Sequence, residues 1–213
     1  MKRSKFNLSH YKLFTGDMGL LYPITWYEAL PGDTIQHRTQ MLIRLSPLLA
    51  PIMHPVRVRV NSFFVPYRLI WDDFEDFITG GPTGDDATVA PTISSASIAE
   101  GSLQDYMGVP PASYSPNLVY SALPIRAYDL IFNEFFRDQD LVTELTIDTT
   151  SGVDSTSDTG IQKVSWEKDY FTAARPWEQK GTEITIPLAG TAPIDADGVF
   201  KLDENAAGLN VGS

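Results

Sequence analysis

The chain has 213 residues, with 16 lysines and arginines, 27 aspartates and glutamates, and a formal net charge of −11. It contains no cysteine, which excludes disulfides, thiolate zinc sites and cysteine nucleophiles. No apolar run follows the basic N-terminus as in a signal peptide, and none approaches the roughly 18 residues of a membrane span. We therefore expect a soluble protein without membrane insertion.

The charge is distributed unevenly along the chain. Residues 1–68 hold nine Lys/Arg against three Asp/Glu, a net of +6. Residues 69–213 hold seven against twenty-four, a net of −17. A chain polarised in this way can face two different environments.

Residues 1–18 are predicted to form a basic, extended N-terminal arm. Its cations could neutralise phosphates through salt-sensitive contacts that do not read sequence. Two further arginines, two apart in a predicted strand, point the same way and could extend this surface. The alternative is that those arginines pair with acids on neighbouring strands or subunits. The candidate nucleic-acid contacts are Lys2, Arg3, Lys5, Lys12, Arg57 and Arg59.

Residues 19–78 are predicted to hold the first strands and a short helix. In the segment 34–45, apolar and polar residues alternate as in a half-buried antiparallel strand. His37 falls on the apolar side, where we expect a packed core histidine. The helix is predicted over residues 71–78, with Trp71, Phe74 and Ile78 on its inner side.

Residues 79–163 are predicted to be an insertion of loop and helix. The stretch 79–116 is rich in Gly, Pro, Ser, Thr and Ala, which indicates a long loop with one short helix near 102–107. The clearest helix is predicted over 124–138, because Pro124 suits a first turn and an apolar stripe follows at helical spacing. The stripe comprises Ile125, Tyr128, Ile131, Phe132, Phe135 and Phe136.

The last part of the chain is predicted to return to strands over 164–188 and then to begin a polar surface insertion over 189–213. About six strands are expected in all, whereas a jelly roll needs eight in two Greek keys. The sequence therefore predicts a mainly β fold that is incomplete within this chain. The predicted strands are 19–27, 34–45, 56–65, 164–172, 183–188 and 199–202.

Five segments, in order over about 180 residues, resemble the major capsid protein of microviruses, most closely the gokushovirus-like branch. They are Phe6–His10, Glu28–Thr34, Phe63–Trp71, Ala122–Tyr128 with Asn133-Glu134 and Phe136–Gln139, and Asp169–Trp177 with Gln179-Lys180-Gly181. The resemblance implies a viral jelly-roll β-sandwich or barrel with long loop insertions and a few short helices. The family's proteins are about twice this length, so we expect this chain to be an N-terminal portion.

The same resemblance implies a structural protein and not an enzyme, with no cofactor. It would self-assemble into a small T=1 icosahedral shell enclosing a single-stranded DNA genome, as part of a virion assembled in the host cytoplasm. The implied partners are further copies of the chain, the DNA, a small basic DNA-packaging protein and a receptor on the host cell.

Aromatic residues are the candidates for packing against the barrel or against neighbouring subunits, because such anchors dominate well-packed contacts. The candidates are Phe63, Phe64, Trp71, Tyr128, Phe132, Phe136, Tyr170, Phe171 and Trp177.

Evidence for catalysis in the sequence is weak. Asp72 and Asp76 would share a helix face, as an acid/base or metal pair requires, but a solvated helix face is the preferred interpretation. The three histidines lie in unrelated contexts, the glycines at 80–84 lack a phosphate-loop lysine, and residues 195–198 lack the rest of a calcium loop. The alternative function is a β-sandwich carbohydrate- or peptide-binding module or a hydrolase, with its site in the loops at 79–116.

Overall fold

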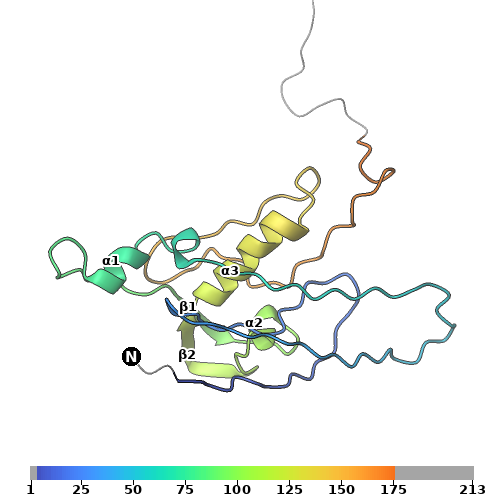
Figure 1. Cartoon of the computed structure of the whole chain (residues 1–213), viewed down its shortest axis with the longest axis horizontal. Helices are drawn as coiled ribbons and strands as arrows, with labels where there is room; N and C mark the ends of the chain where they lie inside the picture. Colours follow the sequence, from blue (N-terminus) through green and yellow to red (C-terminus); the bar gives the residue numbers. More distant parts are fainter. Residues whose placement is uncertain (1–3, 176–213) are drawn as a thin grey trace, which may run out of the picture. The chain divides into compact units, whose positions relative to one another are not determined.

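The structure is a computed structural model that describes residues 4–175. The chain divides into two compact units, Met1–Glu167 and Lys168–Ser213, which are considered separately. Within the described part of the first unit the helices and strands are few and short (Figure 1). They are η1 (Tyr67–Leu69), α1 (Phe74–Thr79), β1 (Thr92–Ser97), α2 (Leu103–Tyr106), β2 (Ser113–Ser121), α3 (Leu123–Ile131) and the π-helical turn η2 (Phe132–Phe136).

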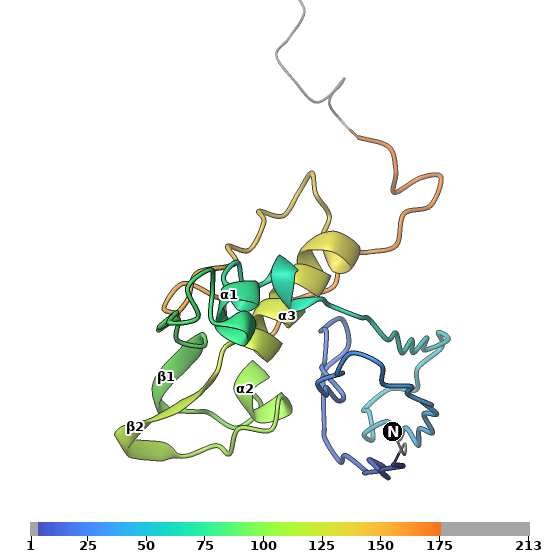
Figure 2. The ribbon, with the colours of Figure 1, turned by 60° about the vertical axis from the view of Figure 1, so that its left-hand side comes forward.

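Strands β1 and β2 pair antiparallel, with Thr92 opposite Ser121 and Ser95 opposite Leu118. The register then shifts before Ser97 meets Ser113, in the stretch where Pro116 has no N–H to donate. Helix α2 lies in the connection between the two strands (Figure 2). The short helix predicted near 102–107 is confirmed as α2, whereas the two strands correct the expectation of a loop over the rest of 79–116. Their serines give no alternation of apolar side chains, so the usual strand signal is missing.

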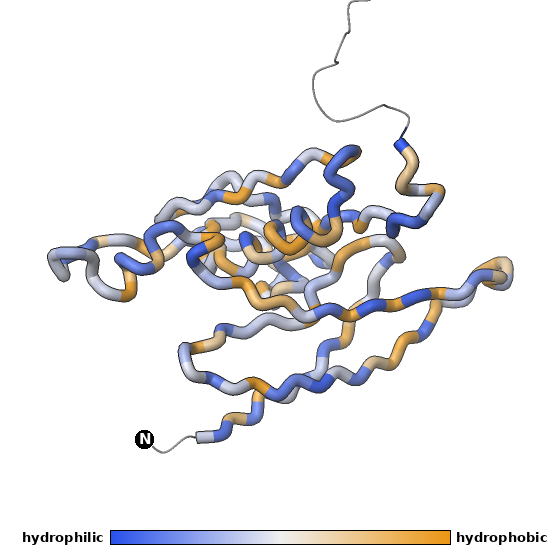
Figure 3. Tube along the Cα trace, turned by 45° about the horizontal axis from the view of Figure 1, so that its top comes forward, coloured by the Kyte–Doolittle hydropathy of each residue, from blue (hydrophilic) through white to orange (hydrophobic). Residues whose placement is uncertain are grey.

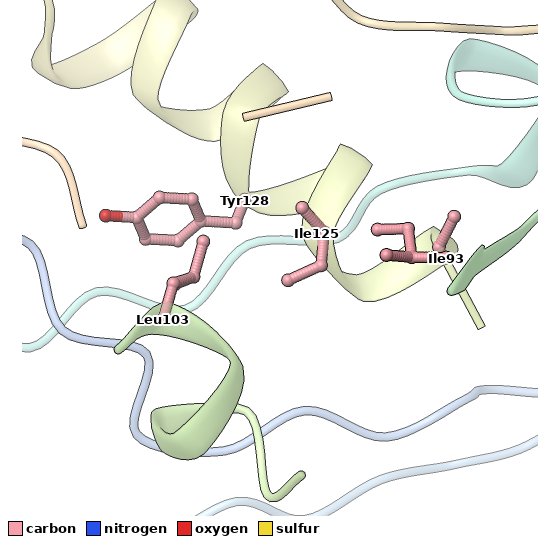
Figure 4. Close-up of a cluster of buried hydrophobic side chains, with 5 residues drawn as sticks. Ile93, Leu103, Ile125 and Tyr128 are labelled. Carbon is pink, nitrogen blue, oxygen red and sulfur yellow. The ribbon is translucent and has the colours of Figure 1, made fainter. Parts of the chain in front are cut away.

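The predicted helix at 124–138 is confirmed, as α3 continued by η2. Its first half packs against β1 and α2 and makes the core of the unit (Figure 4). Beyond Ile131 the wider π-turn moves later side chains out of the i, i+4 register. Phe132, the first residue of η2, is still buried. Phe135, which was expected on the inner stripe, is instead 66% exposed. The buried cluster comprises Ile93, Leu103, Ala122, Ile125 and Tyr128.

The hydroxyl of Tyr128 joins three parts of the chain. It donates a hydrogen bond to the carbonyl of Leu21 and accepts one from the N–H of Gln162, both at 2.9 Å. Burial raises the pKa of Tyr128 to about 12, so the hydroxyl remains a donor at any ordinary pH. The N–H of Leu21 also donates to the carbonyl of Gln162 at 2.9 Å, so the Tyr128 hydroxyl fastens this bridged pair of segments to α3.

Replacing Tyr128 by phenylalanine should destabilise the unit by about 1–3 kcal/mol, because a half-buried carbonyl and a half-buried N–H both lose their partner. Urea unfolding followed by tryptophan fluorescence, to which Trp71 contributes from a site where it is 2% exposed, measures the change. Tyr11→Phe is the control, since Tyr11 is 87% exposed. Equal effects of the two substitutions would contradict the role assigned to the Tyr128 hydroxyl.

The segments 34–45 and 56–65 were predicted as strands, but they run as extended chain without a backbone ladder (Figures 1 and 3). Among the described residues the only sheet is the β1–β2 pair. Ile35, Met41 and Ile43 are each about half exposed, because no second layer covers the apolar side of the alternating pattern. His37 is likewise exposed and contacts Thr39 and Ser62, so the expectation of a core histidine was wrong.

The other strand predictions have similar outcomes. Segment 19–27 contributes a single bridge between Leu20 and Lys163, and no strand forms over 164–172, all of which the structure describes. The strands predicted at 183–188 and 199–202 lie outside the described residues. The short helix predicted at 71–78 forms as α1, but it starts only at Phe74, so Ile78 points outward and is 66% exposed.

The described residues of the second unit, Lys168–Arg175, form a tight turn. The carboxylate of Asp169 accepts hydrogen bonds from the N–H groups of Thr172 at 2.8 Å and Phe171 at 2.9 Å, which lower its pKa. The turn presents Tyr170 and Phe171 edge to face, with ring centroids 5.6 Å apart, and both side chains are more than 80% exposed. In the described parts of both units no helix is long and apolar enough to cross a membrane.

Candidate subunit-contact surface

An open groove of about 600 Å³ lies between the end of α3 and the extended segment before η1. One wall is formed by residues 62–65 with Leu69, and the other by side chains of α3 and η2. We call it the aromatic groove. It is lined by Ser62, Phe63, Phe64, Val65, Leu69, Leu130, Ile131, Glu134 and Phe135.

Aromatic contacts hold the two walls together. The ring of Phe63 lies 4.8 Å from that of Phe135 and meets Phe136 edge to face at 5.9 Å. Phe64 and Phe135 nevertheless remain 80% and 66% exposed. Apart from Ser62 and the carboxylate of Glu134, the lining is apolar. The groove is therefore suited to apolar side chains accompanied by a cation.

The remaining predicted packing residues differ in their placement. Trp71, Tyr128 and Phe132 are at most 4% exposed and belong to the interior of the first unit, which leaves them no area for a neighbour. Tyr170 and Phe171 are presented on the turn of the second unit. Trp177 lies outside the described residues.

Of the predicted nucleic-acid contacts, Lys12 is already engaged by protein. Its ammonium donates to the carbonyls of Pro23, at 2.8 Å, and Tyr106, and it lies over the rings of Phe14 and Tyr106. Burial lowers the pKa of Lys12, and the nearby Asp105 carboxylate offsets part of this effect. The contacts fasten the base of the N-terminal arm to α2.

The other basic candidates are not gathered into one site. Lys5 and Arg57 are exposed, and Arg59 forms a surface ion pair with Glu167. Pairing with an acid was the alternative that the sequence left open for Arg57 and Arg59, and the structure shows such a pair for Arg59, with an acid outside any strand. Lys2 and Arg3 lie outside the described residues.

Sequence reasoning missed a buried charge network centred on Arg126. The guanidinium is fully buried and donates to Asp154 at 2.7 Å and to the carbonyls of Ile70 and Thr150 at 3.0 Å, with Asp148 at 3.7 Å. Burial works to raise the pKa of Asp154, but hydrogen bonds from Ser157, Arg126 and Thr156 together lower it. The only signal in the sequence was an arginine beside an apolar helix stripe, in a chain whose following loop is acidic.

The acidic group at the start of α1 is also structural. Asp72 accepts a hydrogen bond from the hydroxyl of Thr149 at 2.6 Å, and Asp73 accepts one from Ser151 at 2.7 Å. These bonds tie α1 to the loop that also supplies partners to Arg126. Within residues 4–175, no group of three or more His, Asp or Glu side chains is arranged to hold a metal ion.

Comparison with known proteins places the chain among phage capsid proteins. It matches the family described as "Capsid protein (F protein)" over residues 1–210, and the chain belongs to that family. The resemblance to microvirus capsid proteins, drawn from five segments, is thereby confirmed. The comparisons give no support to a carbohydrate- or peptide-binding module or a hydrolase.

Three of the relatives are capsid proteins VP1 of bacterial viruses. The chain is 39% identical to capsid protein VP1 of Bdellovibrio phage phiMH2K over 196 residues, 36% identical to that of Chlamydia phage 1 over 215 residues, and 30% identical to that of Spiroplasma virus 4 over 208 residues. The matches cover 90%, 89% and 90% of this chain, but only 36%, 36% and 37% of the relatives. The chain thus spans little more than a third of their length.

Proposed function

We propose that this chain is part of a capsid subunit that assembles with further copies into a small icosahedral shell around single-stranded DNA. The observation that carries the proposal is the apolar surface of residues 34–65 and of the aromatic groove. Isolated soluble proteins rarely leave large contiguous apolar patches uncovered. Family membership supports a structural, non-catalytic role for this surface.

The extended segments fit the first strands of a jelly roll. Their alternating pattern requires a second apolar layer on one side, and residues outside those described, or other copies, would supply it. Many contacts of modest strength then suffice, because shell closure makes them act together.

The charge distribution favours one orientation in the shell. The basic half, including the exposed Arg57, would face the DNA, where each phosphate contact releases counterions. The acidic half would face outward, where like charge keeps particles apart and host receptors are met. A small basic packaging protein would share the neutralisation of the genome.

Expression of the full-length polypeptide that carries this chain tests the proposal. Light scattering and electron microscopy should find closed particles in the megadalton range that protect single-stranded DNA from nuclease. A stable monomer under all conditions of salt and concentration would contradict it. Particles that assemble equally well without nucleic acid and never protect DNA would contradict the DNA part alone.

A further inference from the structure

The N-terminal segment Ser4–Tyr11, which we call the free arm, is attached at its base and uncovered along its length. The contacts of Lys12 with α2 fix the base. Every residue of the free arm is exposed, including Phe6 at 84% and Leu8 at 67%. Eight extended residues reach about 26 Å beyond Lys12, far enough to meet a neighbouring subunit.

The free arm has a pattern suited to a groove. In an extended chain Phe6 and Leu8 point to the same side, and Asn7 points to the other. Lys5 precedes Phe6 and points to the other side with Asn7, but its long side chain can bend back towards an acid at the rim of a groove. The free arm makes local hydrogen bonds, from the N–H of Ser9 to the side chain of Asn7 and between His10 and the carbonyl of Leu8.

The aromatic groove has the complementary features. Its lining is apolar, its walls are fixed by the pair of Phe63 and Phe135, and its exposed acid is Glu134. Glu134 lines the groove together with Leu130 and Ile131 and is itself exposed, so its carboxylate is accessible from the open side of the groove. No ion pair joins Glu134 to another described residue, and no residue of the free arm lines the groove of its own copy.

We propose that the aromatic groove of one copy receives the free arm of a second copy, with Phe6 and Leu8 inside the groove and Lys5 against Glu134. The inference rests on the proposed self-assembly and names one of its contacts. Arm and groove are different patches of the same chain, so the contact is heterologous, the type that generates closed rings. It gives Lys5 a protein partner in place of the DNA contact that the sequence favoured.

Photo-crosslinking in assembled particles tests the contact. Benzoylphenylalanine replaces Phe64 in the full-length polypeptide, and particles are assembled from an equal mixture of ¹⁵N-labelled and unlabelled subunits. Mass spectrometry should identify heavy–light cross-links between position 64 and the peptide of the free arm. Cross-links only within one copy, to the Tyr170–Phe171 turn, to any other segment, or to nothing would each overturn the proposal. The control is the same probe at Val119, 59% exposed on β2 and outside the groove, which should not capture the free arm.

Charge reversal tests the pairing of Lys5 with Glu134. Lys5→Glu and Glu134→Lys should each reduce the cross-link at position 64 at least fivefold, and the double variant should restore it to within twofold. Glu75→Lys, an exposed acid on α1 outside the groove, should not rescue Lys5→Glu. Single variants without effect, or a double variant without recovery, would overturn the ion pair.

Particle formation by the unmodified protein separates the two levels of inference. Particles without arm–groove cross-links would leave the capsid role standing and reject this contact. A protein that never forms particles would reject both.

Discussion

Replacing Arg126 by methionine is expected to destabilise the first unit by about 3–5 kcal/mol, the range for removing one partner of a buried ion pair. Methionine matches the length of the aliphatic stem but cannot donate hydrogen bonds. Asp154 would be left as an uncompensated buried charge, and the carbonyls of Ile70 and Thr150 would lose their donors. The loss is large because burial of an unpaired polar group costs more than the pair itself contributes.

Urea unfolding followed by tryptophan fluorescence also measures this change. Arg57→Met is the matched control, because Arg57 is exposed and its loss should change stability by no more than about 0.5 kcal/mol. Adding Asp154→Asn to Arg126→Met should recover part of the loss by removing the unpaired charge. A single variant as stable as the wild type, or a double variant that loses the sum of two separate effects, would contradict the network.

The same network explains why a local pattern predicted α3 but not its surroundings. The stripe of Ile125, Tyr128 and Phe132 is visible in sequence because the helix repeats every 3.6 residues. The partner of Arg126 lies 28 residues away in a polar loop, and nothing in that loop marks Asp154 as different from its acidic neighbours. Local periodicity therefore predicted the helix, but the loop residues that bind Arg126 are set by long-range contacts that the local pattern does not contain.

The strands illustrate the opposite error. Residues 34–45 show the right alternation, yet an alternating segment becomes a strand only when another backbone pairs with it. Strands β1 and β2 pair through serine-rich sequence that carries no such alternation. The alternating pattern predicted which side chains could face a core, but it did not predict which backbone segments pair through hydrogen bonds.

The candidate surface was predicted in part. Phe63 and Phe64 do line the aromatic groove, because apolar residues at the end of an extended segment had no place in the local core. Glu134 and Phe135 were not expected there. The π-turn directs this part of η2 outward, and local apolar periodicity does not indicate such a turn.

Asp129, a buried carboxyl one turn after Arg126 in α3, should make the stability of the first unit depend on pH. Asp129 is fully buried, and neither of its oxygens has a hydrogen-bond partner. Burial, with the charges of Asp158 and Asp154, raises its pKa from 3.8 to about 8. The backbone N–H of Asp158 acts in the opposite direction, but it does not reach hydrogen-bond geometry, so it offsets burial only in part.

The sign of the effect follows from where the proton is held. Below pH 3.8 the carboxyl is protonated in both the folded and unfolded states, and its contribution to stability is fully present. Between pH 3.8 and about 8 the unfolded chain releases the proton and the folded chain keeps it, so stability falls as pH rises. At 1.36 kcal/mol per pKa unit the loss is on the order of 5 kcal/mol, and it levels off above pH 8.

Asp129→Asn should therefore remove most of this slope, since the amide resembles the protonated carboxyl in shape and carries no proton to lose. The variant should match the wild type near pH 4 and exceed it by several kcal/mol at pH 8, measured by urea unfolding across that range. Asp158→Asn should lower the midpoint of the wild-type transition without abolishing it, because it removes only one of the charges that raise the pKa of Asp129. Parallel pH profiles for wild type and Asp129→Asn would mean that Asp129 is ionised in the folded protein. The ionised carboxylate of Asp129 would then need a cation or a hydrogen-bond donor from outside this copy of the chain.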